Sequence, residues 1–357
     1  MYRNSYIEIN LDNIKYNIEV LSKAGKKIIG VVKANGYGII DYVEVETLKE
    51  AGVDFFAVSS LDEAIRLRKH SFDDEILILG YVPIESLDIV KVNRFSIVTI
   101  SKDYLEKANL DGIKVHIKID TGMNRIGVEP DETAEVLDLL INKNAKVEGI
   151  MSHLSSADDD LEYTNKQYSI FKECVGKLNY DFKYIHIAAT DGAMILDDDI
   201  CNCRRIGIGM LGYSSHKNNL KPSVSLFSEV VMCKKLEAGE TVSYGRHYTS
   251  DGHGYILTIP IGYADGFYRA NTGKQVYVDG EYGTIVGSVC MDQLMILTEN
   301  PHLPGTMVEL FGDHISIEQR AKELGTITYE LITGLSERLS RKYIKNNKVL
   351  NNIDSRF

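Results

Sequence analysis

Short apolar runs alternate with helical stretches from about residue 28 to residue 212, and this alternation restricts the folds open to the chain. The runs have the length and the Val and Ile content of strands that are buried on both faces. Strand–helix repeats of this kind predict a parallel sheet, and eight of them favour an α/β fold with a closed (β/α)₈ barrel of the TIM type over an open, doubly wound sheet. The expected strands are Lys27–Val32, Asp54–Ser59, Glu75–Gly80, Ser96–Ser101, Lys114–Asp120, Lys146–His153, Lys183–Ala189 and Arg205–Leu211. The clearest helices are Tyr42–Ala51, Leu61–Lys69, Asp131–Asn142 and Tyr163–Leu178, and Ser60 with Glu63 forms a candidate capping box.

The pattern changes near residue 220, where strand-like runs begin to follow one another with few helical gaps. Asp-Gly pairs between the runs supply turns. We therefore expect a barrel over residues 10–220 and a mainly β C-terminal domain over residues 221–357, with residues 1–9 as a candidate extra strand of that domain. Its expected elements are the strands Ser223–Lys234, Thr241–Thr249, Gly254–Ile261, Gln275–Val278, Thr284–Leu297 and Met307–Phe311 and a helical tail from Ser316 to Tyr343.

The bulk composition excludes several classes of function. A net charge of −11 and the lack of a long basic run argue against a nucleic-acid partner. No apolar stretch approaches membrane-spanning length, and the N-terminus lacks the apolar core of a signal peptide. The five cysteines follow no disulfide or zinc pattern, so we expect a cytoplasmic protein without a structural metal and without a membrane partner.

Lys33 follows the apolar run Ile28–Val32 and precedes a turn of Asn and Gly residues. In a β/α barrel the carboxyl ends of the strands build the active site. A lysine in a low-dielectric pocket there can lose its proton and form a Schiff base, although a lysine that only leaves a strand for solvent fits this stretch equally well. Other polar residues also lie near the ends of predicted barrel strands: Lys118, Asp120, Arg125, His153, His186 and Arg205. A structural ion network would explain any one of these residues better than it explains all of them.

The segment Gly207–Gly212 spells GxGxxG, the dinucleotide-binding fingerprint. The preceding segment Cys201–Arg205 is too polar for a typical buried strand, and the motif comes late in a barrel-like series, so a Rossmann site is not expected. A Gly-rich turn after one of the last barrel strands can still offer backbone N–H groups to a phosphate.

Several sequence blocks, taken in order, are similar to those of one enzyme family. The chain resembles the alanine racemases, pyridoxal-phosphate enzymes built from a β/α barrel and a following β domain, over nearly its whole length. One block would be weak evidence, whereas all of them in order are strong. The blocks are Val32–Gly38, Lys118–Gly127, Ser152-His153, Arg205–Ile208, Val242–Gly245, Pro260–Gly266, Cys290–Gln293 and Thr328–Glu330.

The resemblance implies a two-base racemisation of alanine, which supplies D-alanine for bacterial peptidoglycan. It makes Lys33 the residue that carries pyridoxal phosphate as a Schiff base and then acts as the base on one face of Cα. Tyr244 becomes the base on the opposite face, contributed by the other subunit of a homodimer with shared active sites. Without its Ser-Tyr-Gly context, Tyr244 would be read as an aromatic residue on a strand.

The same resemblance implies roles for the other candidate residues. Arg205 would face the pyridine nitrogen, with His153 behind it, and a cation there makes the cofactor a weaker electron sink. Arg125 and the backbone around Met291 match the contacts to the substrate carboxylate. Lys118 matches a lysine that is carbamylated in some relatives, and an unmodified lysine paired with Asp120 is the open alternative. Phosphate-binding positions are matched by Tyr37, Thr190, Gly207, Ile208 and Tyr329, and supporting positions by Asp292 and Tyr263.

Three positions depart from the family pattern. Ile39 stands where a histidine is usual, Ala189-Thr190 replaces Asn-Ser, and Arg338–Arg341 lacks a common proline. These departures leave open a preference for serine or another small amino acid. A decarboxylase of this architecture would set a carboxylate against the pyridine nitrogen, where Arg205 stands. The alternative from another class is a non-catalytic pyridoxal-phosphate carrier, but carriers with a similar barrel typically lack the second domain, and Tyr244 and Arg125 would then have no role.

Overall fold

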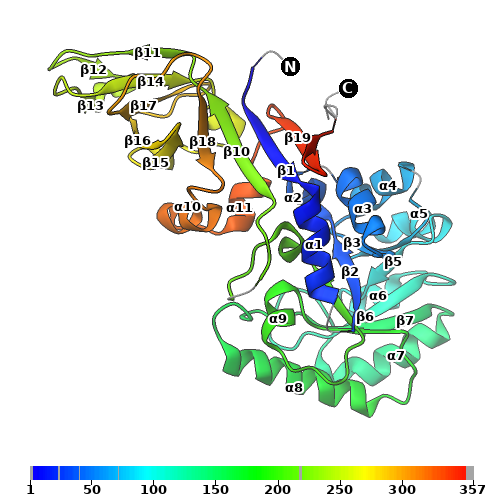
Figure 1. Cartoon of the computed structure of the whole chain (residues 1–357). Helices are drawn as coiled ribbons and strands as arrows, with labels where there is room; N and C mark the ends of the chain where they lie inside the picture. The colour runs from blue at the N-terminus through cyan, green and yellow to red at the C-terminus, as the bar shows by residue number, and fades with distance from the viewer. Residues whose placement is uncertain (1–2, 23–24, 40, 71, 217–218, 351–357) are drawn as a thin grey trace. The chain divides into compact units, whose positions relative to one another are not determined.

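A computed structural model describes residues 3–22, 25–39, 41–70, 72–216 and 219–350 of the 357-residue chain. The chain divides into two compact units, which are coloured along the sequence in Figure 1. The barrel unit is Asn13–Pro222, and the β unit combines Met1–Asp12 with Ser223–Phe357. Within the described ranges, no helix is both long and apolar enough to cross a membrane.

The barrel unit contains eight parallel strands, which pair in the order β8-β7-β6-β5-β4-β3-β2-β9. The two ends of this order, β8 and β9, are connected by hydrogen bonds from Arg205 N to Ala188 O (3.0 Å) and from Asn202 N to Ile185 O (3.0 Å), which close the ring. The predicted (β/α)₈ barrel is therefore confirmed. The strands are β2 (Lys27–Val31), β3 (Phe55–Val58), β4 (Glu75–Ile78), β5 (Ser96–Val98), β6 (Lys114–Lys118), β7 (Lys146–Met151), β8 (Tyr184–His186) and β9 (Cys203–Ile206).

Side-chain caps fix where several of the barrel helices begin. Ser60, Ser101 and Asp160 each accept a hydrogen bond from the backbone N–H three residues later, a contact that contributes about 1 kcal/mol. The predicted capping box is half formed, because the Glu63 carboxylate bonds Ser59 N (2.7 Å) instead of the backbone of Ser60. The helices are α1 (Leu11–Ser22), α2 (Lys33–Tyr37), α3 (Asp41–Glu50), α4 (Leu61–Lys69), α5 (Leu87–Val92), α6 (Lys102–Lys107), α7 (Thr133–Asn142), α8 (Leu161–Lys177) and α9 (Thr190–Ile195).

The β unit is built on a ten-stranded sheet in the order β11-β14-β17-β16-β15-β18-β10-β1-β19-β20. Strand β1 lies between β10, to which it is antiparallel, and β19, to which it is parallel, and its Ile7 and Ile9 are buried. The other strands and the two helices are β10 (Val224–Glu229), β11 (Met232–Lys234), β12 (Thr241–Val242), β13 (Tyr248–Thr249), β14 (Tyr255–Ile259), β15 (Gln275–Val278), β16 (Glu281–Val286), β17 (Leu294–Thr298), β18 (Met307–Phe311), α10 (Ile317–Leu324), α11 (Thr328–Thr333), β19 (Ser340–Lys345) and β20 (Lys348–Val349), with β1 at Tyr6–Asn10.

Five predicted elements are wrong in detail. Ser223–Lys234 is two strands, β10 and β11, and Thr241–Thr249 is two short strands, β12 and β13, with a 3₁₀ turn at Tyr244–Arg246 between them. The helical tail Ser316–Tyr343 is two short helices followed by β19, whose partner β1 is too distant in sequence for a local pattern to indicate it. The single strand predicted at Thr284–Leu297 is two strands, β16 and β17, joined by a loop. The eighth barrel strand is β9 and not Arg205–Leu211, because Ile208–Leu211 form a 3₁₀ turn.

Candidate active site

Lys33 directly follows β2 and opens a turn with unusual backbone geometry. Ala34, Asn35, Gly36 and Tyr37 all have left-handed conformations, with φ between 54° and 59°. This conformation costs each L-residue roughly 1–2 kcal/mol. The Glu63 carboxylate accepts a hydrogen bond from Ala34 N (2.7 Å) and so helps to hold the turn. Backbone strain persists only where surrounding structure imposes it, and it concentrates at functional sites.

The Lys33 amine is partly buried and is influenced by the charge of Arg125. Burial lowers its pKa most, the positive charge of Arg125 lowers it further, and the carboxylate of Glu63 opposes both effects. A lowered pKa increases the fraction of neutral amine, which is the form that acts as a nucleophile or a base. The chemistry expected of a reactive lysine therefore fits the environment of Lys33 better than that of a solvated one.

Arg205 is a buried cation in β9, and no carboxylate pairs with it in the part of the chain that the structure describes. Its two terminal nitrogens meet only neutral acceptors. One donates to His186 Nδ1 (2.7 Å) and His186 O (3.3 Å), and the other to Ser152 O (2.8 Å), Ile187 O (2.8 Å) and His153 Nδ1 (3.0 Å). We find no acceptor for its Nε–H among the described residues, so this donor remains available. Burial lowers the pKa of Arg205 to about 10, which still leaves the group charged at neutral pH.

Arg205 also fixes the protonation of three histidines. Because a guanidinium only donates, the Nδ1 atoms of His153 and His186 must both accept, and both rings are neutral. Burial and the charge of Arg205 accordingly hold the pKa of each far below its usual range. His186 Nε2 then donates to His116 Nδ1 (2.9 Å), and burial lowers the pKa of His116 to about 3.

Three segments meet where the sequence predicts phosphate binding in the barrel unit. A Cβ placed on Gly207 would lie 2.0 Å from the hydroxyl oxygen of Tyr37, so only glycine allows this approach. Thr190 Oγ1 accepts a hydrogen bond from Gly209 N (3.1 Å), and a Cβ on Gly209 would lie 2.7 Å from Thr190 Cγ2. Tyr37, Thr190 and the turn that contains Ile208 therefore form one cluster at the ends of β2, β8 and β9.

The loop after β6 carries Arg125 and is organised by Asp120. The Asp120 carboxylate accepts from Gly122 N (2.9 Å) and Asn124 N (3.0 Å), so it faces its own loop. No ion pair joins it to Lys118 within the described ranges, and the predicted Lys118–Asp120 pair is not formed. Lys118 is 5% exposed, and burial together with the charges of Arg125 and Arg205 lowers its pKa to about 8.

In the β unit, Tyr244 combines a constrained backbone with a free side chain. Ser243 before it has φ 67°, and its Oγ donates to Ser288 O (2.8 Å), while Ser288 Oγ donates to Tyr244 O (3.1 Å). The Tyr244 side chain is nevertheless 77% exposed. A tyrosine on a packed strand would be covered, so the alternative of a purely structural aromatic does not fit this exposure.

Tyr244 also lines a hollow of about 910 Å³ in the β unit, together with Tyr263, Arg269, Met291 and Asp292. The loops that carry these residues are tied to each other by backbone hydrogen bonds, from Tyr263 N to Cys290 O (3.0 Å) and from Ala264 N to Met291 O (3.0 Å). The strand predicted at Thr284–Leu297 is interrupted at these residues. The interruption leaves Met291 and Asp292 in a loop, where both residues are exposed.

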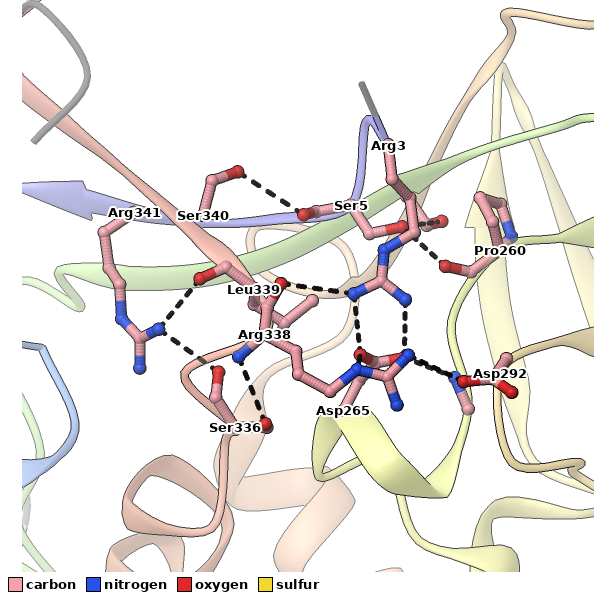
Figure 2. A network of polar contacts seen from close by, with 12 residues as sticks. Arg3, Ser5, Pro260, Asp265, Asp292, Ser336, Arg338, Leu339, Ser340 and Arg341 are labelled. Carbon is pink, nitrogen blue, oxygen red and sulfur yellow. Dashed lines mark hydrogen bonds and ion pairs between the residues drawn. The ribbon is translucent and has the colours of Figure 1, made fainter. Parts of the chain in front are cut away.

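Figure 2 shows the ion network beneath these loops. The fully buried Asp265 carboxylate accepts two hydrogen bonds from Arg3 (2.7 and 3.0 Å) and one from Gly262 N (3.0 Å). Arg338 lies 3.5 Å from the same carboxylate and also binds Asp292 (2.6 Å). Arg338 thus supplies a cation that joins the two loops.

The structure groups the predicted site residues within each unit. The barrel unit collects Lys33, Tyr37, Lys118, Arg125, His153, Thr190, Arg205, Gly207 and Ile208 at the carboxyl ends of its strands, and the β unit collects Tyr244, Tyr263, Met291 and Asp292 around its hollow. Tyr329 lies on α11, and its contact with a phosphate stays a prediction. Sequence reasoning missed His116, whose spacing of two residues from Lys118 on a strand could have indicated that both point into the barrel. It also missed the Arg3–Asp265 pair, for which the sequence carries no signal.

Comparisons with known proteins agree with this arrangement. The sequence models of the alanine racemase N-terminal and C-terminal domains match residues 9–215 and 223–343. Alanine racemase of Staphylococcus epidermidis is 38% identical over 368 residues, covering 97% of this chain and 96% of that protein. The crystal structure of alanine racemase from Bacillus anthracis with bound L-Ala-P has a TM-score of 0.92 at 32% identity, covering 99% of this chain and 98% of that one. Histidine racemase from Leuconostoc mesenteroides has a TM-score of 0.87 at 27% identity, covering 96% and 99%.

Proposed function

This chain belongs to the alanine racemase family, and from that premise we propose that it interconverts L- and D-alanine by moving the Cα proton between the two faces of the substrate. In a bacterium this reaction supplies D-alanine for peptidoglycan. The observation that carries the proposal is the environment of Lys33, a lysine of lowered pKa on a strained turn at the end of a barrel strand.

Three features of the barrel unit support pyridoxal phosphate as the cofactor. Lys33 offers an amine whose lowered pKa favours the neutral form that can bind an aldehyde. Tyr37, Thr190 and the turn at Gly207 and Ile208 offer hydroxyl and backbone donors suited to a phosphate. Arg205 offers one remaining N–H, suited to a ring nitrogen that keeps its lone pair. When bound, pyridoxal phosphate withdraws electron density from the substrate and acidifies its Cα proton.

The residues of this chain would then divide the work. Arg125 binds the substrate carboxylate, for which its planar guanidinium is well suited, and the Met291 backbone adds a further contact. Lys33 takes or returns the Cα proton on one face, and the Tyr244 hydroxyl does so on the other. Arg205 stays protonated and withholds its proton from the ring nitrogen, which limits how far charge spreads from Cα and so restricts side reactions.

The exposure of Tyr244 supports a shared active site. Its side chain projects from a hydrogen-bonded turn and lines a hollow of about 910 Å³. We propose that this surface completes the site of a second copy of the chain in a homodimer, as in the family. A Tyr244→Phe chain mixed with a Lys33→Ala chain should then regain part of the activity that each variant lacks, because one site in the mixed dimer has both bases. Failure to regain activity in proven mixed dimers would contradict a shared site.

Lys118 has the properties of a lysine that reacts with carbon dioxide. Its amine is nearly buried, has a pKa of about 8 and lacks an ion-pair partner in the described part of the chain. We propose that Nζ adds to CO₂ and releases a proton, so that the resulting carbamate faces the cations of Arg125 and Arg205. Protein equilibrated with ¹³C-bicarbonate should show one carbamate carbon per chain by NMR, and Lys118→Arg should show none.

The test of the proposed function is proton exchange measured by NMR in D₂O, with the pure protein, pyridoxal phosphate and each enantiomer of alanine and serine. We expect deuterium at Cα of alanine together with inversion of its configuration. Faster reaction of serine would assign a serine racemase instead, and histidine belongs in the same series because a related racemase carries that name. Protein that binds the cofactor but exchanges no Cα proton would indicate a pyridoxal-phosphate carrier.

A further inference from the structure

Helix α8 carries a fully buried amide, Gln167, on a face that packs otherwise through Thr164, Tyr168, Phe171 and Cys174. Burying an amide is unfavourable unless its hydrogen bonds are made. Gln167 lies outside every block of family resemblance, and the proposed chemistry does not use it. Its presence in this packed face therefore needs a reason.

Gln167 makes four hydrogen bonds, all to the loops after β6 and β7. Its Oε1 accepts from Ser155 N (2.9 Å) and Ser155 Oγ (3.1 Å). Its Nε2 donates to His153 O (3.2 Å) and Thr121 Oγ1 (3.3 Å). A backbone N–H can only donate and a carbonyl can only accept, so these partners fix the orientation of the amide.

The direction of the next hydrogen bonds follows from that orientation. Thr121 Oγ1 accepts from Gln167, and Ser152 Oγ donates to Ile119 O (2.8 Å). The remaining contact, 2.8 Å between the two hydroxyls, is therefore donated by Thr121 and accepted by Ser152. A single directed chain runs from the Gln167 amide through both hydroxyls to the end of β6, and every donor in it is used.

These contacts hold the two loops that carry the proposed cofactor and substrate residues. Thr121 begins the loop that leads to Arg125, and His153 bonds Arg205 (3.0 Å). A second contact from α8 acts on the first loop, because the Tyr163 hydroxyl donates to Gly122 O (3.0 Å). A Cβ on Gly122 would lie 2.4 Å from that hydroxyl, so the loop approaches the helix as closely as its backbone permits.

We propose that Gln167 is a positioning residue that fixes the Arg125 loop relative to His153 and Arg205, and so sets the affinity for the substrate carboxylate. Its effect on substrate rests on the proposed function, whereas its effect on loop order does not. The cluster of Tyr37, Thr190 and Gly207 lies at the ends of other strands. Loss of Gln167 should therefore affect substrate binding much more than cofactor binding.

The decisive comparison is Gln167→Leu against Thr164→Val, both as the full chain with pyridoxal phosphate. Gln167→Leu puts an apolar side chain, one atom shorter, in place of the amide and removes all four hydrogen bonds. Thr164→Val changes a fully buried position of the same helix whose hydroxyl has no hydrogen-bond partner in the described part of the chain. If Gln167→Leu fails to fold, Thr121→Val replaces it in the comparison, because it removes the hydroxyl that accepts from Gln167 and donates to Ser152.

Amide hydrogen exchange is the first measurement, because it needs no activity. In Gln167→Leu we expect peptides covering 120–127 and 152–156 to exchange on the order of tenfold faster than in Thr164→Val, since their tethers are lost. Equal exchange in the two variants would overturn the proposal. If the unmodified protein fails to racemise alanine, the proposed function falls, but the exchange comparison still decides whether Gln167 holds the loops.

Steady-state kinetics then distinguish a residue that positions the substrate-binding loop from one whose loss disturbs the whole site. For Gln167→Leu we expect KM for alanine to rise on the order of tenfold, with kcat within about threefold and cofactor Kd within about twofold. Thr164→Val should leave all three unchanged. A parallel loss of kcat, substrate affinity and cofactor affinity in Gln167→Leu would indicate a merely structural residue and overturn the positioning role.

Discussion

The barrel unit and the β unit each bury an arginine-containing network, but they satisfy the charge in opposite ways. In the β unit, the buried Asp265 carboxylate is matched by Arg3 and Arg338. In the barrel unit, Arg205 is surrounded by neutral histidines and carbonyls, and we find no carboxylate beside it among the described residues. A paired charge has little remaining effect on a ligand, whereas an unpaired one keeps its field. The difference separates a network that supports loops from one that can act on a bound molecule.

The largest effect on this difference is expected from Arg205→Glu, which replaces the unpaired guanidinium by a carboxylate. We expect racemisation to fall by about 10³-fold, because an anion at this position would hold a proton on the ring nitrogen. Loss of the amino group to the cofactor should appear as a side reaction. Chiral analysis of alanine and the absorbance of the cofactor measure the two effects. Arg205→Lys, which keeps the charge, is the control, and near-normal racemisation by Arg205→Glu would contradict our interpretation.

The second largest effect is expected from acid, which should lower the free energy of unfolding because the barrel network depends on neutral histidines. The folded-state pKa values of His116, His153 and His186 lie below that of an unfolded histidine, near ~6.5. Below that pH the unfolded chain binds protons that the folded chain does not. The free energy of unfolding should therefore fall with decreasing pH by about 1.4 kcal/mol per pH unit for each histidine, until the folded-state pKa is reached.

Urea unfolding at a series of pH values from 7 downward tests this expectation. His116→Leu should reduce the histidine part of the slope by one-third, whatever it does to the stability at neutral pH. A slope that is unchanged in His116→Leu would show that this histidine does not titrate on unfolding.

The smallest effect is expected in the β unit, from Asp265→Asn. Removing the buried carboxylate leaves Arg3 and Arg338 without their shared partner, but both remain partly exposed to water. We expect a loss of about 2 kcal/mol in the free energy of unfolding, measured with urea. Asp292→Asn removes the exposed partner of the same Arg338 and should cost under about 1 kcal/mol. Equal losses in the two variants would argue against a special role for burial.

The sequence predicts the barrel well because its signals are local. Most barrel strands are short apolar runs, and Lys33 is recognisable at the end of the first. Arg205 is harder, since two arginines make Cys203–Ile206 look unlike a buried strand until their partners are known. The position of Lys33 could be predicted, whereas the neutral surroundings of Arg205 could not.

Other errors have a different cause. Strand β19 was expected to be helix because its partner, β1, lies at the other end of the chain. Gln167 was overlooked because a glutamine on an amphipathic helix is usually solvated, and nothing local shows that its partners lie in two loops. Predictions failed where a contact joins residues distant in sequence, and several of those contacts support the site.

The position of β1 has a consequence for how the chain is made. Ribosomal synthesis delivers Tyr6–Asn10 before the barrel residues, whereas its neighbours Val224–Glu229 and Ser340–Lys345 are delivered after them. At about 5–20 residues per second the strand must wait roughly 15–70 s for its second neighbour. The barrel residues emerge in that interval and can fold first. A bulky fusion placed before β1 should therefore hinder the late pairing of β1 with β10 and β19 and leave the folding of the barrel unaffected.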